Sequence, residues 1–242
     1  RVKGGKNLIS PLPSPPCKTP DISMALLQRD QPIAFSVLFG PIFCYLRLTC
    51  ALRKGHSKTT QALCWDHVDP DLREKKIFTC LDSIESNTKI IVIENSNNIN
   101  FQKNLENKYK NLKCFLTGNN HGYAKGNNIG LSKVETKYAL VLNPDTVIEK
   151  KSLENFFITA KKYPEFSLIG PAYENNVTEK KIEGDIIEVE NLKGFAIFIN
   201  MQKFKDKSFF DENYFLYFED IDLCKKVKKD NGTIFLDSSI KI

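Results

Sequence analysis

An acidic residue in the middle of the chain lies where it could bind a metal ion. Residues 139–142 are all apolar, and Asn143, Pro144 and Asp145 follow them. Such a run is typical of a central strand of a parallel sheet, and a proline ends the strand because it has no N–H to donate. Ligands of open α/β sheets bind at the carboxyl ends of strands, so Asp145 could bind a divalent cation and, through it, a diphosphate. The alternative is an ordinary turn, since these residue types are common in turns.

Two further polar segments follow predicted strands or precede a helix. Glu94, Asn95 and Ser96 come directly after the predicted strand 89–93, in which residues 90–93 are apolar. A carboxylate at that strand end could accept N–H bonds from a nucleotide base, and the alternative is a turn closed by a side chain. Residues 119–128 combine small residues and amides at a helix start, where backbone N–H groups can approach a phosphate. Their spacing matches neither a Walker motif nor a dinucleotide fingerprint.

A group of three acids follows an aromatic run near the C-terminal end of the sequence. Residues 214–218 are rich in Tyr and Phe, and Glu219, Asp220 and Asp222 come next, at the start of a predicted helix. Acids there suit the helix dipole, which is the simplest account of them. A carboxylate in this place could also deprotonate an acceptor hydroxyl beside an aromatic sugar-binding wall.

Composition indicates a globular protein and argues against binding of nucleic acid. The chain has 242 residues, of which 41% are hydrophobic and 26% charged, with a net charge of +6. After residue 75 the lysines are interspersed with acids and form no basic and aromatic stripe, so we expect no nucleic-acid partner. The seven cysteines include no Cys-x-x-Cys pair. An odd count without that pair favours reduced thiols in the cytoplasm over a disulfide framework or a zinc site.

The character of the sequence changes near residue 75. All five arginines lie before it, as do eight of the eleven prolines, whereas asparagine becomes frequent only after Asn87. We therefore expect residues 1–74 to be an atypical N-terminal extension, poorly structured or unrelated, and residues 75–242 to be one domain. Residues 33–52 are apolar but are interrupted by Pro41 and Arg47, which makes them a weak candidate for a membrane helix.

Strand and helix patterns alternate after this change. The predicted strands cover 89–93, 111–116, 138–142, 166–170 and 233–236, and the predicted helices cover 124–133, 152–163 and 219–229. Ser152 is the expected N-cap of the second helix. Repeated strand–helix–strand order predicts an α/β fold with a mainly parallel sheet flanked by helices.

Several motifs occur together in a characteristic order over about residues 76–242. They are Cys80-Leu81-Asp82-Ser83-Ile84, Glu94-Asn95-Ser96, Asn120-x-Gly122-Tyr123-Ala124-x-Gly126-Asn127, Leu142-Asn143-Pro144-Asp145, Lys193-Gly194-Phe195-Ala196, Phe210-Asp211-Glu212-Asn213-Tyr214-Phe215 and Glu219-Asp220-x-Asp222-Leu223. Their order and spacing resemble family 2 glycosyltransferases, especially the rhamnosyltransferase-like branch.

The resemblance implies a GT-A-like, nucleotide-sugar-binding sheet and transfer of a sugar from a nucleotide-diphosphate donor to a hydroxyl, usually with inversion. It places Mg²⁺ or Mn²⁺ on Asp145, the general base on Asp220 with Glu219 as its rival, and the acceptor beside Gly194 and Asp222. The residues implied in binding of the nucleotide sugar are Glu94, Asn95, Ser96, Asn120, Gly122, Asn127 and Asn143.

The resemblance also implies a biological setting. The expected partners are a nucleotide-diphosphate sugar and a glycan or lipid-linked acceptor, in synthesis of cell-surface polysaccharide or glycolipid. The expected location is the cytoplasm, and the sequence leaves open a peripheral association with the inner face of the cell membrane.

Both ends of the chain depart from the family pattern. The family opens with a strand and a Thr-Tyr-Asn-like turn, which residues 1–74 do not resemble. The chain stops at Ile242, about where the family continues to a strand-end His and acceptor-side helices. We therefore expect the sheet to lack its first strand and its C-terminal end. The alternatives to an active transferase are an inactive or truncated remnant and a nucleotide-sugar-binding module without transfer activity.

Overall fold

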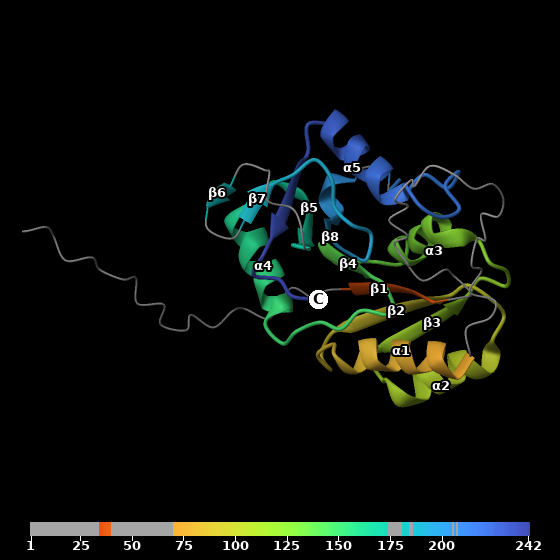
Figure 1. The fold of residues 1–242 in the computed structure, drawn as a ribbon. Coiled ribbons are helices and arrows are strands. Elements are labelled where there is room, and N and C mark those ends of the chain that lie inside the picture. Colours follow the sequence, from red (N-terminus) through yellow and green to blue (C-terminus); the bar gives the residue numbers. More distant parts are fainter. Residues whose placement is uncertain (1–33, 40–69, 174–180, 184–185, 205, 207) are drawn as a thin grey trace, which may run out of the picture. The chain divides into compact units, whose positions relative to one another are not determined.

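The computed structural model describes residues 34–39, 70–173, 181–183, 186–204, 206 and 208–242. Strands and helices alternate along most of this part of the chain (Figure 1). In chain order the elements are β1 (Ala34–Phe39), α1 (Pro70–Asp82), β2 (Lys89–Glu94), α2 (Ile99–Lys108), β3 (Leu112–Leu116), α3 (Gly122–Leu131), β4 (Tyr138–Leu142), α4 (Ser152–Lys162), β5 (Phe166–Pro171), β6 (Lys181–Glu183), β7 (Ile186–Glu188), β8 (Ala196–Asn200), the 3-10 helix η2 (Met201–Lys203), α5 (Glu219–Lys229) and β9 (Thr233–Asp237).

The strands of the described residues form one sheet in the order β3-β2-β1-β4-β8-β5-β9-β7-β6. The four strands β3, β2, β1 and β4 are parallel neighbours, and β9 is parallel to β5. Strand β8 lies between β4 and β5 and runs antiparallel to both. The predicted α/β fold with a sheet flanked by helices is confirmed.

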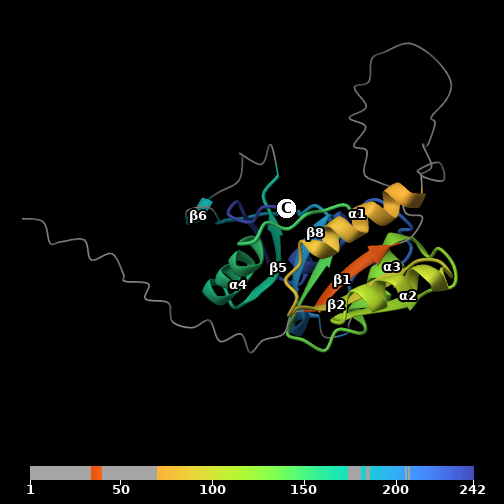
Figure 2. The same cartoon turned by 90° about the horizontal axis from the view of Figure 1, so that it is seen from below.

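Both faces of the sheet are buried, and the strands supply alternate residues to each. In β2, Ile90 and Val92 face one core, whereas Ile91 and Ile93 face the other. This is the two-residue period of a strand, and it explains why the strands read as continuous apolar runs. Helices α1, α2 and α4 cover the first face, and α3 and α5 cover the second (Figures 1 and 2).

The expected absence of the first strand is wrong. Residues 34–39 form β1, which pairs in parallel with β2 on one side and β4 on the other, in a register that places Phe39 beside Glu94 and Val37 beside Leu142. The strand lies inside the segment that the sequence suggested was an unrelated extension. A central strand is defined by backbone partners on both of its sides. The pattern of a short apolar run in the sequence does not show those partners.

The apolar segment 33–52 is therefore in part a sheet strand, and the rest of the segment lies outside the described residues. None of the helices in the described part of the chain is both long and apolar enough to cross a membrane. The expected lack of the family's C-terminal part stays a prediction.

Most predicted elements agree with the structure to within two residues, but one predicted cap is wrong. Helix α4 has Lys151 at its N-cap position. The hydroxyl of Ser152 instead donates to the carbonyl of Lys241 at 2.7 Å and accepts from the N–H of Lys241 at 2.8 Å. Ser152 thus ties the start of α4 to the segment after β9, a contact with a distant residue that competes with capping.

Because β1 is central, a proline within it should unfold the sheet. Ser36 pairs with Ile91 and Val141, so Ser36→Pro removes a donor between two paired strands. We expect a loss of about 3 kcal/mol or more in the free energy of unfolding, measured by urea titration. Ser36→Ala keeps the N–H and is the matched control. Equal stability of the two variants would contradict the central placement of β1.

Candidate active site

The carboxyl ends of β2 and β4 place two of the predicted polar groups at one edge of the sheet. Strand β2 ends at Glu94, and β4 ends at Leu142, with β1 between them. Strand β8 runs the other way, so its first residue, Ala196, lies opposite Leu142. The N–H of Asn143 donates to the carbonyl of Phe195 at 2.9 Å. The segment before β8 therefore meets the turn after β4.

The predicted nucleotide loops after β2 and β3 are tied together by Asn95. Its Nδ2 donates to Oδ1 of Asn120 at 3.0 Å and to the carbonyl of Gly122 at 3.2 Å. Its Oδ1 accepts from the N–H of His121 at 3.0 Å and from the hydroxyl of Thr117 at 3.1 Å. Asn95 is buried with its hydrogen-bonding groups engaged, so it holds the shape of the two loops.

Glu94 presents its carboxylate beside these loops. It is buried at the end of β2 and accepts a hydrogen bond from the hydroxyl of Ser96. That hydroxyl also accepts from the N–H of Asn98 at 3.2 Å. Ser96 thus orients the carboxylate that the sequence assigned to the nucleotide base.

Gly122 allows helix α3 to meet the aromatic loop that precedes α5. Its φ is +79°, and a Cβ at this position would lie 2.3 Å from the carbonyl oxygen of Phe215. The N–H of Tyr123 donates to that same oxygen at 2.8 Å. A glycine is required here both for its left-handed backbone and for the close approach.

Asn127 lies one turn further along α3 and is fully buried. Its Nδ2 donates to the carbonyl of Tyr123 at 3.1 Å. Its Oδ1 has no hydrogen-bond partner among the residues that the structure describes. A buried amide oxygen without a partner is uncommon in native proteins and is typical of functional regions.

The turn that carries Asp145 is contacted by Cys80 of helix α1 and by Ser83, the residue after that helix. The carbonyl of Asn143 accepts from the hydroxyl of Thr146 at 2.6 Å and from Sγ of Cys80 at 3.7 Å. The hydroxyl of Ser83 accepts from the N–H of Ile148 at 3.1 Å. Burial raises the pKa of the Cys80 thiol to about 12, so the thiol keeps its proton at neutral pH and can donate. The side chain of Asp145 is exposed on this braced turn.

Asp220, the predicted general base, contacts Gly194 directly. Its Oδ2 accepts from the N–H of Gly194 at 2.9 Å, and its Oδ1 accepts from the N–H of Ile221 at 2.8 Å. A Cβ on Gly194 would lie 3.4 Å from Oδ2, so the carboxylate lies against the glycine. The N–H of Asp222 donates to the carbonyl of Phe218 at 2.8 Å, which places its half-buried side chain in the first turn of α5.

Glu219, the rival for that role, is in a different environment. Its side chain is 0% exposed, and neither carboxylate oxygen has a hydrogen-bond partner among the described residues. Desolvation by burial, with a smaller contribution from the charge of Asp220, raises the pKa of Glu219 to about 7. The carboxylate of Asp220 is therefore oriented by two backbone N–H groups, whereas that of Glu219 has no such partner among the described residues and is about half protonated near pH 7.

The loop before α5 is aromatic, exposed and strained. The exposed fraction is 65% for Phe218, 49% for Phe215 and 40% for Tyr217. Tyr217 and Phe218 have φ values of 68° and 71°, which non-glycine residues seldom adopt and which cost on the order of 1–3 kcal/mol each. Strain of this kind is concentrated at functional sites.

The structure brings the predicted residues into two groups. Glu94, Asn95, Ser96, Asn120 and Gly122 form the first group, at the ends of β2 and β3. Asn143, Gly194, Glu219 and Asp220 form the second, around the start of β8. The hydroxyl of Tyr123 contacts Asn143 and Gly194 of the second group, and Tyr123 follows Gly122 of the first group in the chain. Sequence reasoning missed Tyr123, together with Cys80 and Ser83, as part of the site. All three lie in the quoted motifs, but only their contacts show what they do.

No group of three or more His, Cys, Asp or Glu side chains in the described ranges could hold a metal ion by itself. This arrangement is compatible with Mg²⁺ or Mn²⁺, because Mg²⁺ in phosphate-transferring sites is commonly held by one or two carboxylates together with the phosphates of the substrate. The exposed carboxylate of Asp145 fits that requirement.

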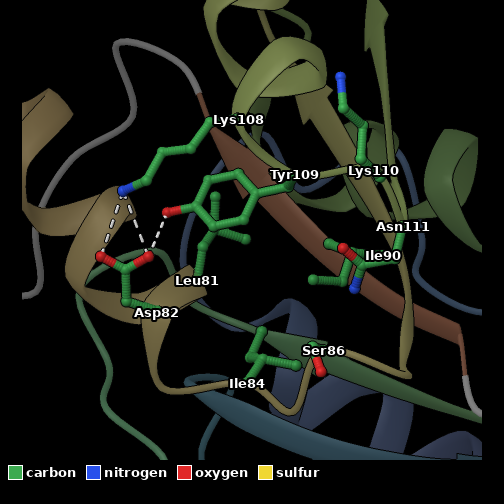
Figure 3. Close-up of a pocket in the computed structure, with 9 residues that line it drawn as sticks. All are labelled: Leu81, Asp82, Ile84, Ser86, Ile90, Lys108, Tyr109, Lys110 and Asn111. Atoms are coloured by element: carbon green, nitrogen blue, oxygen red, sulfur yellow. Dashed lines mark hydrogen bonds and ion pairs between the residues drawn. The ribbon is translucent and has the colours of Figure 1, made fainter.

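A pocket of about 550 Å³ lies elsewhere, at the amino ends of β2 and β3 (Figure 3). Ile90 lines it, four residues from Glu94, or about 13 Å along the strand. At its rim Asp82 accepts from the hydroxyl of Tyr109 at 2.6 Å and forms an ion pair with Lys108 at 3.2 Å. The pocket is therefore separate from the candidate site.

An α/β sheet with an exposed carboxylate after one strand and a second carboxylate across the same edge is an arrangement suited to binding a diphosphate and deprotonating a hydroxyl. A model of the family described as glycosyl transferase family 2 matches residues 73–224, more than half of the chain. The chain belongs to this family.

Similar proteins agree with this assignment. The low-salt glycan biosynthesis hexosyltransferase Agl10 of Haloferax volcanii is 24% identical over 66% of this chain and 60% of its own length. The rhamnosyltransferase WbbL of Escherichia coli K12 is 25% identical over 63% of this chain and 71% of its own length. The crystal structure of GalNAc-T7 with UDP, GalNAc and Mn²⁺ has a TM-score of 0.60 at 10% identity, over 87% of this chain and 43% of that protein. The GT-A-like fold is confirmed, and the chain spans under two thirds of the Haloferax relative.

The raised pKa of Glu219 predicts how stability depends on pH. The folded state favours the protonated form, so stability should fall as pH rises from about 4.5 to about 7, by on the order of 2–3 kcal/mol. Glu219→Gln cannot ionise and should lack this loss, which urea unfolding at pH 5 and pH 8 would measure. If the wild type and the variant changed equally between these pH values, the raised pKa would be contradicted.

Proposed function

We propose that this chain is a metal-dependent, inverting glycosyltransferase that moves a sugar from a nucleotide-diphosphate donor to a hydroxyl of a glycan or lipid-linked acceptor. The observation that carries the proposal is a pair of hydrogen bonds at one edge of the sheet. The segment Gly194–Phe195 bonds to Asp220 through the N–H of Gly194 and to the start of the Asp145 turn through the carbonyl of Phe195. Membership in glycosyl transferase family 2 supports it, as do relatives described as a hexosyltransferase and a rhamnosyltransferase.

The donor is assigned to the edge formed by β2, β1 and β4. Glu94, oriented by Ser96, would accept N–H bonds from the nucleotide base. Asp145 would hold Mg²⁺ or Mn²⁺ against the diphosphate, and the bound metal would supply positive charge that stabilises the departing nucleoside diphosphate. Asn95 and Asn120 keep the loops around the nucleotide in place.

The acceptor is assigned to the side of Gly194, Asp222 and the exposed aromatic loop. Asp220 would take the proton of the acceptor hydroxyl as its oxygen attacks the anomeric carbon, while the bond from that carbon to the diphosphate breaks. One displacement of this kind inverts the anomeric configuration. Asp220 suits the role better than Glu219 because the N–H of Gly194 orients its carboxylate beside the segment that meets the Asp145 turn, whereas the side chain of Glu219 is fully buried.

The setting that we propose is the synthesis of cell-surface polysaccharide or glycolipid, in the cytoplasm. The description of the Haloferax relative as a glycan biosynthesis enzyme supports the part of this proposal that concerns glycan synthesis. Two other outcomes have distinct signatures. A remnant would bind no donor, and a binding module would bind a donor without transferring its sugar.

Loss of the Asp145 carboxylate should remove metal-dependent donor binding. We expect UDP-, GDP- or dTDP-sugars to bind in the presence of Mn²⁺, and Asp145→Ala to weaken that binding by about tenfold or more, which is about 1.4 kcal/mol, by calorimetry. Glu149→Ala, which removes an exposed acid four residues further on, is the matched control. Metal-dependent binding of undiminished affinity in Asp145→Ala would refute the metal assignment, and no binding of any donor by the wild type would favour the remnant.

Loss of the Asp220 carboxylate should stop turnover and spare donor binding. We expect Asp220→Asn to lower kcat by about 10²–10⁴-fold, the usual contribution of a general base, while calorimetry shows unchanged affinity for the donor. Asp230→Asn, at the far end of α5, is the control and should transfer sugar normally. Normal turnover in Asp220→Asn together with its loss in Glu219→Gln would assign the base to Glu219 instead.

A further inference from the structure

The hydroxyl of Tyr123 lies between the turn after β4 and the segment before β8. The side chain is 4% exposed, and its Oη lies 2.6 Å from the carbonyl oxygen of Gly194 and 3.2 Å from Oδ1 of Asn143. The shorter contact takes the one proton of the hydroxyl. With the Asn143 amide turned by 180°, its Nδ2 donates to the same hydroxyl, and this orientation satisfies both contacts of Tyr123.

The peptide that Tyr123 holds is the one that joins the proposed base to the Asp145 turn. The N–H of Gly194 donates to Asp220 at 2.9 Å, and the carbonyl of the next residue, Phe195, accepts from the N–H of Asn143 at 2.9 Å. Between these two bonds lies the carbonyl of Gly194, which accepts from Tyr123. One backbone segment thus carries three contacts in sequence, and the middle contact depends on a single side-chain hydroxyl.

Gly194 makes that hydroxyl important, because glycine has the freest backbone of any residue. Gly194 has no side chain that could restrain its peptide plane, so the hydrogen bond to its carbonyl is needed to hold that plane. The ring of Tyr123, by contrast, is fixed by packing, since it meets the ring of Phe210 edge-on at 6.0 Å. The hydroxyl is therefore presented from a fixed position to a glycine, the residue type with the freest backbone.

We propose that the Tyr123 hydroxyl is a positioning group that fixes the Gly194–Phe195 segment, and through it the placement of the Asp220 carboxylate relative to the Asp145 turn. The inference rests on the proposed function of Asp220 and Asp145. It assigns no contact with the substrate to Tyr123. Its role is to keep the carboxylate of Asp220 at a fixed distance from the Asp145 turn, because small misplacements of reacting groups cost large factors in rate.

A double-mutant cycle tests this role in the full chain. Tyr123→Phe should lower kcat about tenfold with little change in the KM of the donor, and it should cause no further loss in an Asp220→Asn background, because the two changes act on one step. Tyr138→Phe, a buried tyrosine of β4 in the cluster with Phe166 and Phe198, is the control and should keep its activity. An equal fractional loss in both backgrounds, or unchanged kcat, would overturn the proposal.

A second measurement does not depend on activity. In Tyr123→Phe the amide hydrogen of Gly194 should exchange with solvent about tenfold faster than in the wild type or in Tyr138→Phe. The amide of Leu192, which donates to Sγ of Cys224 at 3.3 Å in the same segment, should be unchanged. Unchanged exchange at Gly194 would refute the positioning role, as would equal acceleration at both amides.

Failure of the positioning role can be told apart from failure of the proposed function. If Asp145→Ala and Asp220→Asn leave transfer intact, the assigned chemistry is wrong, whatever Tyr123→Phe does. If both abolish their expected steps while Tyr123→Phe behaves like Tyr138→Phe, only the positioning role is wrong.

Discussion

The candidate site depends on the direction of one strand. Strand β8 lies between β4 and β5 and runs antiparallel to both, so its amino end lies at the edge where β4 ends. Gly194 and Phe195, just before β8, therefore reach Asn143, and the start of α5 reaches Gly194. A parallel strand in the same place would carry these residues to the opposite edge of the sheet, at the amino ends of the parallel strands.

The rest of the domain makes that edge rigid and leaves a few groups at it unsatisfied. The sheet is buried on both faces, and Cys80 of α1 and Ser83, the residue after that helix, brace the Asp145 turn. By contrast, the aromatic loop before α5 is strained, and the carboxyl of Glu219 has no hydrogen-bond partner in the described part of the chain. The strained loop and the unpartnered carboxyl lower the stability of the fold at the edge where substrates are expected to bind, a pattern typical of active sites.

Much of the fold could be predicted from the sequence because its signals are local. Strand β4 is a continuous apolar run ended by proline, and α5 begins at its acids and ends near Lys229, as its pattern indicates. Strand β1 was missed because five apolar residues and a serine, without the family's Thr-Tyr-Asn-like turn after them, resemble many other segments. Its identity as a central strand comes from pairing with β2 and β4, whose residues lie far away in the chain.

By itself, the sequence determined which residues could do chemistry and in what order they occur, since strand ends, helix starts and motif spacing are properties of neighbouring residues. The tertiary structure alone decided which of them meet. Tyr123 and Gly194 are 71 residues apart, and Gly194 and Asp220 are 26 apart. Their contacts exist because β8 is antiparallel, and the two-residue period of an apolar strand reads the same in both directions.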